Sequence, residues 1–104
     1  MFNICFLEIN MAISSFACKE TKKIFNLYRS KKLPQEIQHV ALRKLRVLHA
    51  VKTLEELKQP PGNNLEKLKG DLRNCYSIRI NNQWRIIFEF KDNDALNVRI
   101  RDYH

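Results

Sequence analysis

Two segments in the second half of the chain alternate apolar and polar side chains, which is typical of half-buried β-strands. They cover residues 76–80 and 84–90, with a polar stretch at residues 81–83 between them. A slip of one residue would turn every side chain to the other face, so the pairing must keep both apolar sets together. The pattern therefore predicts a hairpin with a three-residue loop, in which Ile78 pairs with Ile86.

The same register places Arg79 directly across from Arg85 on the second face of the hairpin. Side chains at directly opposed positions lie roughly 4.5–5.5 Å apart at Cβ, so these two like charges repel each other. A polyanion lying across the sheet would explain the pair. We therefore expect this face to contact nucleic acid.

A third alternating segment, residues 96–100, follows a turn at Asp92-Asn93-Asp94. The same parity argument pairs Phe88 with Val98 and Ile86 with Ile100. Arg85 then faces Arg101, and Gln83 lies near Tyr103. The three arginines would form a row on the open face of the sheet, although Arg101 also suits a charge that keeps a strand edge soluble.

The first half of the chain has the periodicity of helices. We expect a short extended segment at residues 12–17, a helix over 19–30 and a second, stronger helix over 35–51. A capping box predicts a turn of helix at residues 53–57, and a loop containing Pro60, Pro61 and Gly62 follows it. The predicted fold class is α+β, with two N-terminal helices packed on one face of a small, mainly antiparallel β-sheet.

The length and composition favour a single intracellular domain. A chain of 104 residues, 44% apolar, can bury one core. Residues 1–10 are predicted to be a dispensable extension and residues 11–104 the domain, the alternative being an extra edge strand at residues 1–10. The three cysteines suit a reducing, cytoplasmic location. We expect no metal, no cofactor and no membrane span.

The formal net charge of +8 is concentrated in the helical half. Residues 11–58 hold eleven basic and four acidic side chains, whereas residues 65–104 hold eight and six. Small basic proteins tend to bind nucleic acid or acidic partners. Arg43 and Arg46 on the second helix are therefore predicted to contact RNA, with an ordinary solvated helix face as the alternative.

Several motifs, taken together and in order, resemble the HigB toxins of the RelE superfamily. They are Leu-Lys-Gly-Asp at residues 68–71, Tyr-Ser-Ile-Arg-Ile-Asn-Asn-Gln-Trp-Arg-Ile at 76–86 and Asp-Tyr-His at 102–104. The similarity also includes Val-Ala-Leu-Arg-Lys-Leu-Arg at 40–46 and the Pro-Pro-Gly-Asn loop. It extends over essentially all of residues 11–104.

The resemblance implies the toxin of a type II toxin–antitoxin pair. Members of the family are endoribonucleases that cut mRNA in the ribosomal A site during translation, without metal or organic cofactor. The implied partners are the ribosome, mRNA and a HigA-type antitoxin with a helix-turn-helix domain. Operator DNA would be contacted only through that antitoxin.

The resemblance also implies roles for individual residues. Lys69, Arg79 and Arg85 match basic positions of the family, and Asp102, Tyr103 and His104 match its carboxy-terminal catalytic triplet. Some relatives carry a histidine where this chain has Glu66. Either Glu66 replaces that histidine as a base or His104 takes the role. Further RNA contacts are expected from a basic set comprising Arg79, Arg73, Arg101, Arg43 and Arg46.

RNA cleavage of this kind needs a base for the 2′-OH, cations for the charge on phosphorus and an acid for the 5′-oxygen. Arginine suits the second role because its guanidinium binds phosphate in a bidentate fashion and stays charged. Histidine has the intrinsic pKa of an acid or base near neutrality. Asp102 could orient His104, and Tyr103 could stack on a base or donate a proton. A non-catalytic RNA-binding module and an antitoxin-bound co-repressor are the alternative functions.

Overall fold

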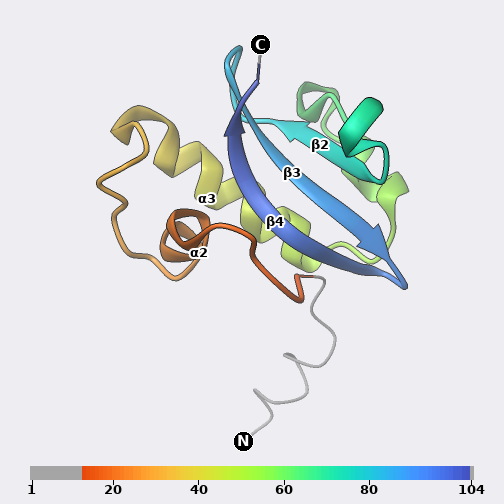
Figure 1. Cartoon of the computed structure of the whole chain (residues 1–104), viewed down its shortest axis with the longest axis horizontal. Helices are drawn as coiled ribbons and strands as arrows, with labels where there is room; N and C mark the ends of the chain where they lie inside the picture. The colour runs from red at the N-terminus through yellow and green to blue at the C-terminus, as the bar shows by residue number, and fades with distance from the viewer. Residues whose placement is uncertain (1–12, 104) are drawn as a thin grey trace, which may run out of the picture.

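The computed structural model describes residues 13–103, and the elements occur in the order expected for an α+β domain (Figure 1). Two helices come first, then two short 3₁₀ turns, then four strands with a third 3₁₀ turn between the first two. The elements are α2 (Lys19–Phe25), α3 (Gln35–Ala50), η1 (Leu54–Lys58), η2 (Pro61–Asn63), β1 (Glu66–Lys67), η3 (Gly70–Leu72), β2 (Cys75–Arg79), β3 (Trp84–Lys91) and β4 (Asp94–Asp102).

The four strands form one antiparallel sheet in the order β1-β2-β3-β4. The register of the first hairpin is confirmed, with Ile78 opposite Ile86 and Arg79 opposite Arg85. Its loop is closed by a backbone bond from the amide of Ile80 to the carbonyl of Trp84, at 2.9 Å. The alternation of apolar side chains was therefore enough to set this register.

The second hairpin reaches the expected register by a different route. Its turn has two residues, Asp92 and Asn93, with φ of 53° and 70°, and Lys91 pairs with Asp94. Two positive φ values in a two-residue loop are the geometry that matches strand twist. With this turn alone, every residue of β3 would pair one position away from its expected partner on β4. A second register shift, between Ile87 and Glu89, restores the expected pairs beyond that point.

That second shift is a β-bulge next to Asn97, whose φ is 53°. The bulge adds one residue to β4, so Arg85 still faces Arg101 and Ile86 still faces Ile100. The expected pairing of Phe88 with Val98 is wrong, because both residues lie at the bulge. The arginine register is therefore correct although the turn length was not.

The main core lies between the two helices and one face of the sheet (Figure 1). The stripe of α3 predicted from periodicity is buried at Ile37, Ala41, Leu45 and Leu48, and Val40 lies at its margin. From the sheet, the core takes its apolar face, namely Ile78, Ile80, Ile86, Phe88, Val98 and Ile100. Trp84 and Phe90 pack against it as partly buried aromatics.

The first helix ends earlier than predicted, at Phe25 instead of residue 30. The amide of Tyr28 donates to the carbonyl of Lys23, and the amide of Leu27 donates to that of Ile24. This pair of bonds is a Schellman motif, and it requires a left-handed residue, here Leu27 at φ 71°. Leucine is an unusual choice at that position, so no residue type marked the stop.

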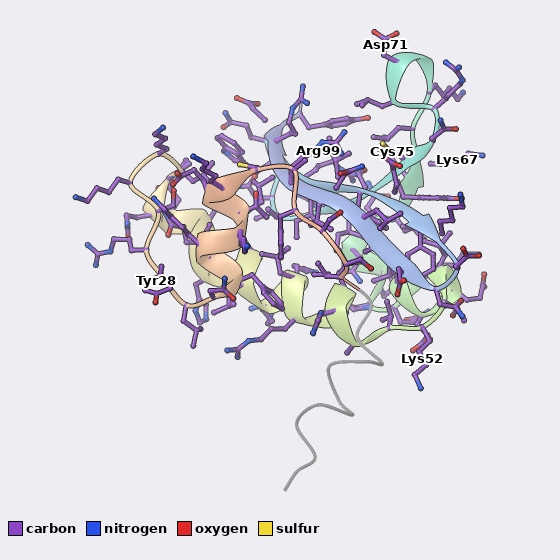
Figure 2. The ribbon with its side chains drawn as sticks, turned by 60° about the horizontal axis from the view of Figure 1, so that its bottom comes forward. Tyr28, Lys52, Lys67, Asp71, Cys75 and Arg99 are labelled. Carbon is purple, nitrogen blue, oxygen red and sulfur yellow. The ribbon has the colours of Figure 1, made fainter. Side chains whose placement is uncertain are left out.

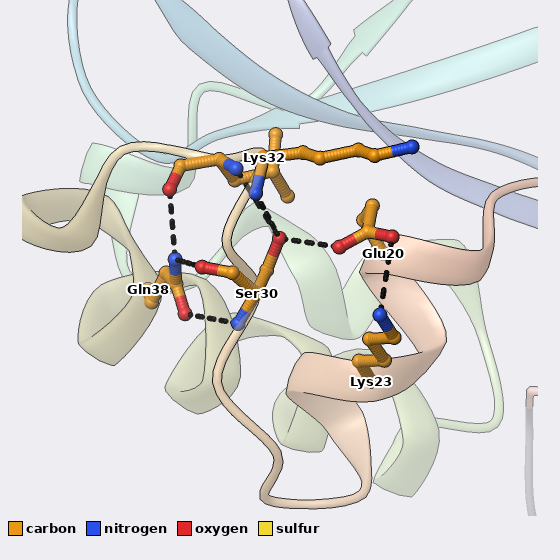
Figure 3. Close-up of polar contacts among 6 residues, drawn as sticks. Glu20, Lys23, Ser30, Lys32 and Gln38 are labelled. Atoms are coloured by element: carbon orange, nitrogen blue, oxygen red, sulfur yellow. Dashed lines mark hydrogen bonds and ion pairs between the residues drawn. The ribbon is translucent and has the colours of Figure 1, made fainter.

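Ser30 fixes the connection between α2 and α3 (Figure 3). Its buried hydroxyl donates to Glu20 at 2.6 Å and accepts from the amides of Lys32 and Leu33, both at 3.2 Å. Gln38 closes the loop from α3, bonding the Ser30 amide and carbonyl at 3.0 and 2.8 Å. The Ser30 bond is also the main cause that lowers the pKa of the Glu20 carboxyl.

The N-terminal segment contacts β4 in place of forming a full strand. Ile13 and Phe16 make isolated parallel bridges to Ala95 and Val98, and the amide of Ser14 donates to the carbonyl of Ala95 at 2.8 Å. The predicted strand at 12–17 is thus reduced to two bridges within the described part of the chain. Residues 1–10, interpreted above as an extension, lie outside it.

The second face of the sheet is only partly open. A small cluster of Leu68, Cys75 and Ile87 is buried there, with Leu72 packed against it. Ser77 and Arg85, on the same face, are also buried. The sequence predicted an open row of arginines, but Arg85 in the middle of the row is buried and contacts Asn64 and Glu66.

Candidate active site

A hollow of about 430 Å³ lies on this second face, beside the loop of the first hairpin. The residues that line it come from β1 and the segment before it, from β2 and β3, from the loop between these strands, and from the residue after β4. The lining residues are Asn64, Glu66, Arg79, Asn81, Asn82, Arg85 and Tyr103. Four of the residues predicted to act in catalysis, Glu66, Arg79, Arg85 and Tyr103, are thus brought together.

Arg85 is the most constrained residue of the hollow, with only 5% of its surface exposed. Its Nη1 donates to Glu66 Oε1 at 3.1 Å and to the hydroxyl of Ser77, and its Nη2 donates to the carbonyl of Asn64 at 3.2 Å. A buried charge is tolerated only when it is paired and hydrogen-bonded. These contacts therefore fix the guanidinium in one orientation at the wall of the hollow.

The loop that supplies the Asn64 carbonyl is anchored by the buried side chain of the preceding residue. The side chain of Asn63 is 1% exposed and donates to the carbonyls of Leu57 and Gln59, at 3.1 and 3.2 Å. Asn64 follows in the left-handed region at φ 46°. Asparagine tolerates that conformation better than most residues, so the carbonyl can point at Arg85.

Arg79 occupies the opposite position on β2 and is half-buried. Its Nη2 donates to the side-chain oxygen of Asn82 in the hairpin loop. Asn81 shapes the same loop, because its side-chain oxygen accepts from the amides of Gln83 and Trp84, each at 2.8 Å. The second guanidinium of the hollow is therefore positioned by the turn.

Tyr103 completes the hollow from the end of β4. Its ring centroid lies 5.3 Å from Arg85 Cζ, which is cation–π contact, and the residue is 39% exposed. Its amide donates to the carbonyl of Gln83 at 2.6 Å, as the predicted register required. One face of this ring contacts the arginine, and the exposed part is available to a ligand.

Asp102 precedes Tyr103 and faces Trp84 across the ladder. Its Oδ2 accepts from the side chain of Gln83 at 2.9 Å. Asp102 is not among the residues that line the hollow. His104, the third member of the predicted triplet, lies outside the described residues, so its role remains a prediction.

Glu66 lies at the rim, with 46% of its side chain exposed. It pairs with Ser77 in the ladder, directly beside the Arg85 contact. In the protein as described, its carboxylate supplies the negative charge that balances Arg85. A phosphate entering the hollow would meet both groups at once, one a cation and the other a proton acceptor.

The remaining predicted residues lie elsewhere. Lys69 and Arg73 line a separate hollow beyond β1, and Arg101 is exposed on β4 opposite Arg85. Arg43 and Arg46 are exposed on the outer face of α3. The structure therefore separates the predicted set into one constrained group and several surface cations.

Four residues of the site were absent from the sequence prediction: Asn64, Ser77, Asn81 and Asn82. Ser77 had one available signal, since it is a small polar residue alternating with apolar ones inside a predicted strand. The two loop asparagines were predicted as a turn, but not Asn82 as the acceptor for Arg79 nor Asn81 as the acceptor for the loop amides. Nothing local marked the Asn64 carbonyl, because its role depends on how the preceding loop folds.

Metal-binding and membrane-spanning features are both absent from residues 13–103. No group of three His, Cys, Asp or Glu side chains in that range could hold a metal ion. None of the helices in the same range is long and apolar enough to cross a membrane.

The arrangement of two helices against a four-stranded antiparallel sheet is the RelE-like fold. It is similar to a solved chain of the YoeB–YefM complex from Staphylococcus aureus, with a TM-score of 0.51 and 20% sequence identity. That match covers 88% of this chain and 97% of the other. At this identity the likeness concerns the fold alone.

The sequence matches are more specific. The family model of the RelE-like toxin of type II toxin-antitoxin system HigB matches residues 14–104, and the chain belongs to this family. It is 42% identical over 69 residues to Toxin HigB-1 of Vibrio cholerae serotype O1, covering 66% of this chain and 73% of that one. It is 32% identical over 95 residues to Endoribonuclease HigB of Proteus vulgaris, covering 88% and 99%.

Proposed function

We propose that this toxin is an endoribonuclease that cuts mRNA in the ribosomal A site during translation and so stops protein synthesis. The observation that carries the proposal is the buried Arg85, held by Glu66, Ser77 and Asn64 at the wall of a hollow that also contains Arg79 and Tyr103. Fixed cations aimed at one point stabilise developing negative charge far better than mobile surface cations do. The Proteus vulgaris relative carries the name of an endoribonuclease.

The proposed chemistry is an attack of the ribose 2′-oxygen on the adjacent phosphorus. A base takes the 2′-OH proton, the bond from the 2′-oxygen to phosphorus forms, and the bond from phosphorus to the 5′-oxygen breaks. An acid protonates the leaving 5′-oxygen, giving a 2′,3′-cyclic phosphate and a 5′-hydroxyl. Arg85 and Arg79 would bind the nonbridging oxygens, whose charge grows in the transition state. Two guanidinium groups meet that charge, so the proposed mechanism is metal-independent.

Two residues are candidates for the base. Glu66 lies next to the phosphate-binding cation, with Oε1 3.1 Å from Arg85 Nη1, and its carboxylate is exposed to the hollow. His104 has the more suitable intrinsic pKa. We assign the base to Glu66 and the acid to the carboxy-terminal residues, in which Asp102 orients His104. Tyr103 offers its exposed ring to a base or its hydroxyl as a proton donor.

The ribosome and mRNA are the proposed targets, and an antitoxin of HigA type is the proposed partner. We expect operator DNA to be contacted only through the antitoxin, and the toxin to act in the cytoplasm. Charge supports an encounter with ribosomal RNA, since cations of the helical half, Arg43 and Arg46 among them, face solvent.

The outer face of α3 is the surface we propose for the antitoxin. Two hollows of about 420 and 230 Å³ share His39 and Leu42 and form one apolar groove along the helix. Leu27 and Tyr28 extend this surface with 68% and 69% exposure, and Tyr28 projects into solvent (Figure 2). Exposed apolar patches of this kind mark interaction sites. Arg43 and Arg46 line the groove, so a segment with apolar and acidic side chains would complement it.

The direct test is a reconstituted translation reaction with purified toxin and a defined mRNA, followed by mapping of the RNA ends. Cuts within the codon in the A site, with a 5′-hydroxyl on the downstream fragment, are the expected result. Arg85→Lys keeps the charge but not the fork, and should remove the cuts. Ribosome-stalled mRNA without cuts would favour a non-catalytic RNA-binding module, and no effect on translation would favour a co-repressor.

A further inference from the structure

A second basic hollow lies beyond β1, apart from the one that contains Arg85. It is formed by two adjoining depressions of about 420 and 360 Å³ that share Lys67, Arg73 and Asn74. Lys69 lines the first depression and Lys91 the second. Within residues 13–103, none of these four cations forms an ion pair with a carboxylate. Their charge is therefore available to a ligand.

The backbone beneath these cations is fixed. The turn η3 reverses the chain at Gly70, where φ is +68°, and the amides of Leu72 and Arg73 donate back to the carbonyls of Lys69 and Gly70 at 3.3 and 3.1 Å. Leu68 is buried in the small cluster, and its amide donates to the carbonyl of Cys75 at 2.9 Å. Lys69 and Arg73 thus flank an ordered turn, whereas Lys67 projects from β1 and Lys91 ends β3 (Figure 2).

The two hollows meet at β1. Glu66 lines the candidate active site, and the next residue, Lys67, lines the second hollow. Their ladder partners are Ser77 and Tyr76, so the two side chains leave the strand on opposite faces. β1 is a two-residue edge strand, and among residues 13–103 no further strand lies outside it. A ligand crossing this edge passes directly from one hollow to the other.

The chemistry of the second hollow suits the backbone of a single nucleic-acid strand. Lysine and arginine bind phosphates, the side-chain amide of Asn74 can bond a base or a ribose, and Tyr76 and Phe90 line the second depression with aromatic rings. One acid, Glu89, also lines it, and its carboxylate already accepts from Asn97 at 3.0 Å. The balance of charge is therefore strongly positive.

We propose that this hollow is a second RNA subsite, which binds the phosphates of the substrate strand next to the nucleotide that is cut. The inference rests on the proposed function, because it places the same strand in both hollows. It gives Lys69 a binding role at a distance from the scissile phosphate. The RNA strand would pass over β1 and bind in the hollows on both sides of that edge.

The test uses the full chain and RNA that cannot be cut, with 2′-O-methyl groups on every ribose. Binding of a nine-nucleotide strand and of a trinucleotide is measured by fluorescence anisotropy across a series of salt concentrations. The variant Lys67→Gln/Arg73→Gln removes two exposed cations of the hollow, and Lys22→Gln/Lys31→Gln removes two exposed cations of the helical half as a matched control.

We expect the variant to bind the longer strand more weakly, with a log–log salt slope smaller by about 0.7 for each phosphate that is no longer neutralised. Its affinity for the trinucleotide should be reduced less than its affinity for the longer strand, and both affinities of the control should stay as in the wild type. An unchanged slope for the longer strand, or an equal reduction in the control, would overturn the subsite. So would a loss of antitoxin affinity with RNA binding intact.

The two proposals fail in different ways. If the salt slope changes as expected but unmodified mRNA is never cut on ribosomes, the subsite stands and the nuclease proposal falls. If mRNA is cut but the slope is that of the wild type, the nuclease stands and the subsite falls.

Discussion

The cations of α3 and those of the sheet are held in different ways. Arg43 and Arg46 are exposed on the outer face of the helix, beside an apolar groove. Arg85 is 5% exposed and is bonded to Glu66, Ser77 and Asn64. Mobile exposed cations attract any polyanion, whereas a fixed guanidinium can match one geometry.

The difference shows that the number of positive charges in a region does not predict where the candidate active site lies. The helical half holds most of the net positive charge, yet the two hollows lined by its Arg29, Arg43 and Arg46 contain no acidic side chain. The sheet holds fewer cations, and two of them, Arg79 and Arg85, line one hollow. Changing each region separately tests whether the two kinds of cation act differently.

The largest effect is expected from Arg85→Lys, because a lysine cannot reproduce the fork held by three partners. Loss of one such group costs roughly 10²- to 10³-fold in rate. Arg43→Lys, the same change on the helix, should leave cleavage near the wild-type rate. The measurement is the rate of A-site cleavage in reconstituted translation, with circular dichroism to show that both variants fold. Equal rates for the two variants would remove the distinction between the regions.

Glu66→Gln tests the proposed base. The amide keeps an oxygen for Arg85 but cannot accept the proton, so cleavage should fall by about 10²-fold or more. Glu36→Gln, an exposed glutamate on α3, is the matched control. The rate is measured as a function of pH, and loss of the acidic limb in Glu66→Gln would identify the titrating group. A variant with a normal rate would return the base to His104.

Arg46→Glu tests the helical surface. Reversing a charge on the groove should weaken antitoxin binding by about tenfold or more, because acidic side chains of the partner would then be repelled. Lys22→Glu, an exposed reversal outside the groove, should have little effect. Titration calorimetry with the proposed HigA-type antitoxin gives the affinities. Equal affinities for both variants would place the antitoxin on another face.

Ser30→Ala tests the loop between the helices. The change leaves the amides of Lys32 and Leu33 and the Glu20 carboxylate without their common partner. The free energy of unfolding should fall by about 1–3 kcal/mol, the usual cost of buried groups left unsatisfied. Ser14→Ala, at an exposed serine, should stay within about 0.5 kcal/mol of the wild type. Urea denaturation measures both.

The smallest effect concerns His49, which lies on α3 with its ring centroid 4.9 Å from that of Phe25. Its buried Nδ1 has no partner among the described residues, and burial lowers the pKa of the imidazole below 6.5. A lowered pKa means that the unfolded chain binds the proton more readily. Stability is therefore full above pH 6.5 and falls as the pH drops through the folded-state pKa.

Replacing the imidazole removes this titration. His49→Leu should flatten the acid side of the stability curve, whereas His39→Leu, at an exposed histidine on the same helix, should not. Thermal denaturation at a series of pH values from about 7.5 to 5.5 measures both. A wild-type curve without any acid slope would contradict the prediction.

The sequence was most informative about the sheet. Parity alone placed Arg79, Arg85 and Arg101 in one row, because a wrong register would have exposed Ile78 and Ile86. Parity could not show that this row depends on both a two-residue turn and a bulge at Asn97. Each of the two shifts the register of β4 by one residue, so either one alone would take Arg101 out of the row. Local patterns set the faces of strands but not the number of residues in a turn.

The candidate site was predicted only in part. The resemblance indicated Arg85 as catalytic and left Glu66 as one of two candidates for the base, yet their ion pair depends on the pairing of β1 with β2. The burial of Arg85 depends on Asn63 and Asn64, whose loop is shaped by contacts distant in sequence. The early end of α2 at Phe25 likewise had no local signal, because leucine rarely occupies a left-handed position.

The proposed role of Arg85 in cleavage of translated mRNA can be tested directly in cells. The measurement is a brief induction of residues 11–104 in cells lacking the antitoxin, with transcriptome-wide mapping of new RNA 5′ ends. We expect cuts confined to translated frames, with a codon-position bias, that are lost in Arg85→Lys and kept in Arg43→Lys. Absence of new ends with folded toxin present, or the same cuts in Arg85→Lys, would contradict this role.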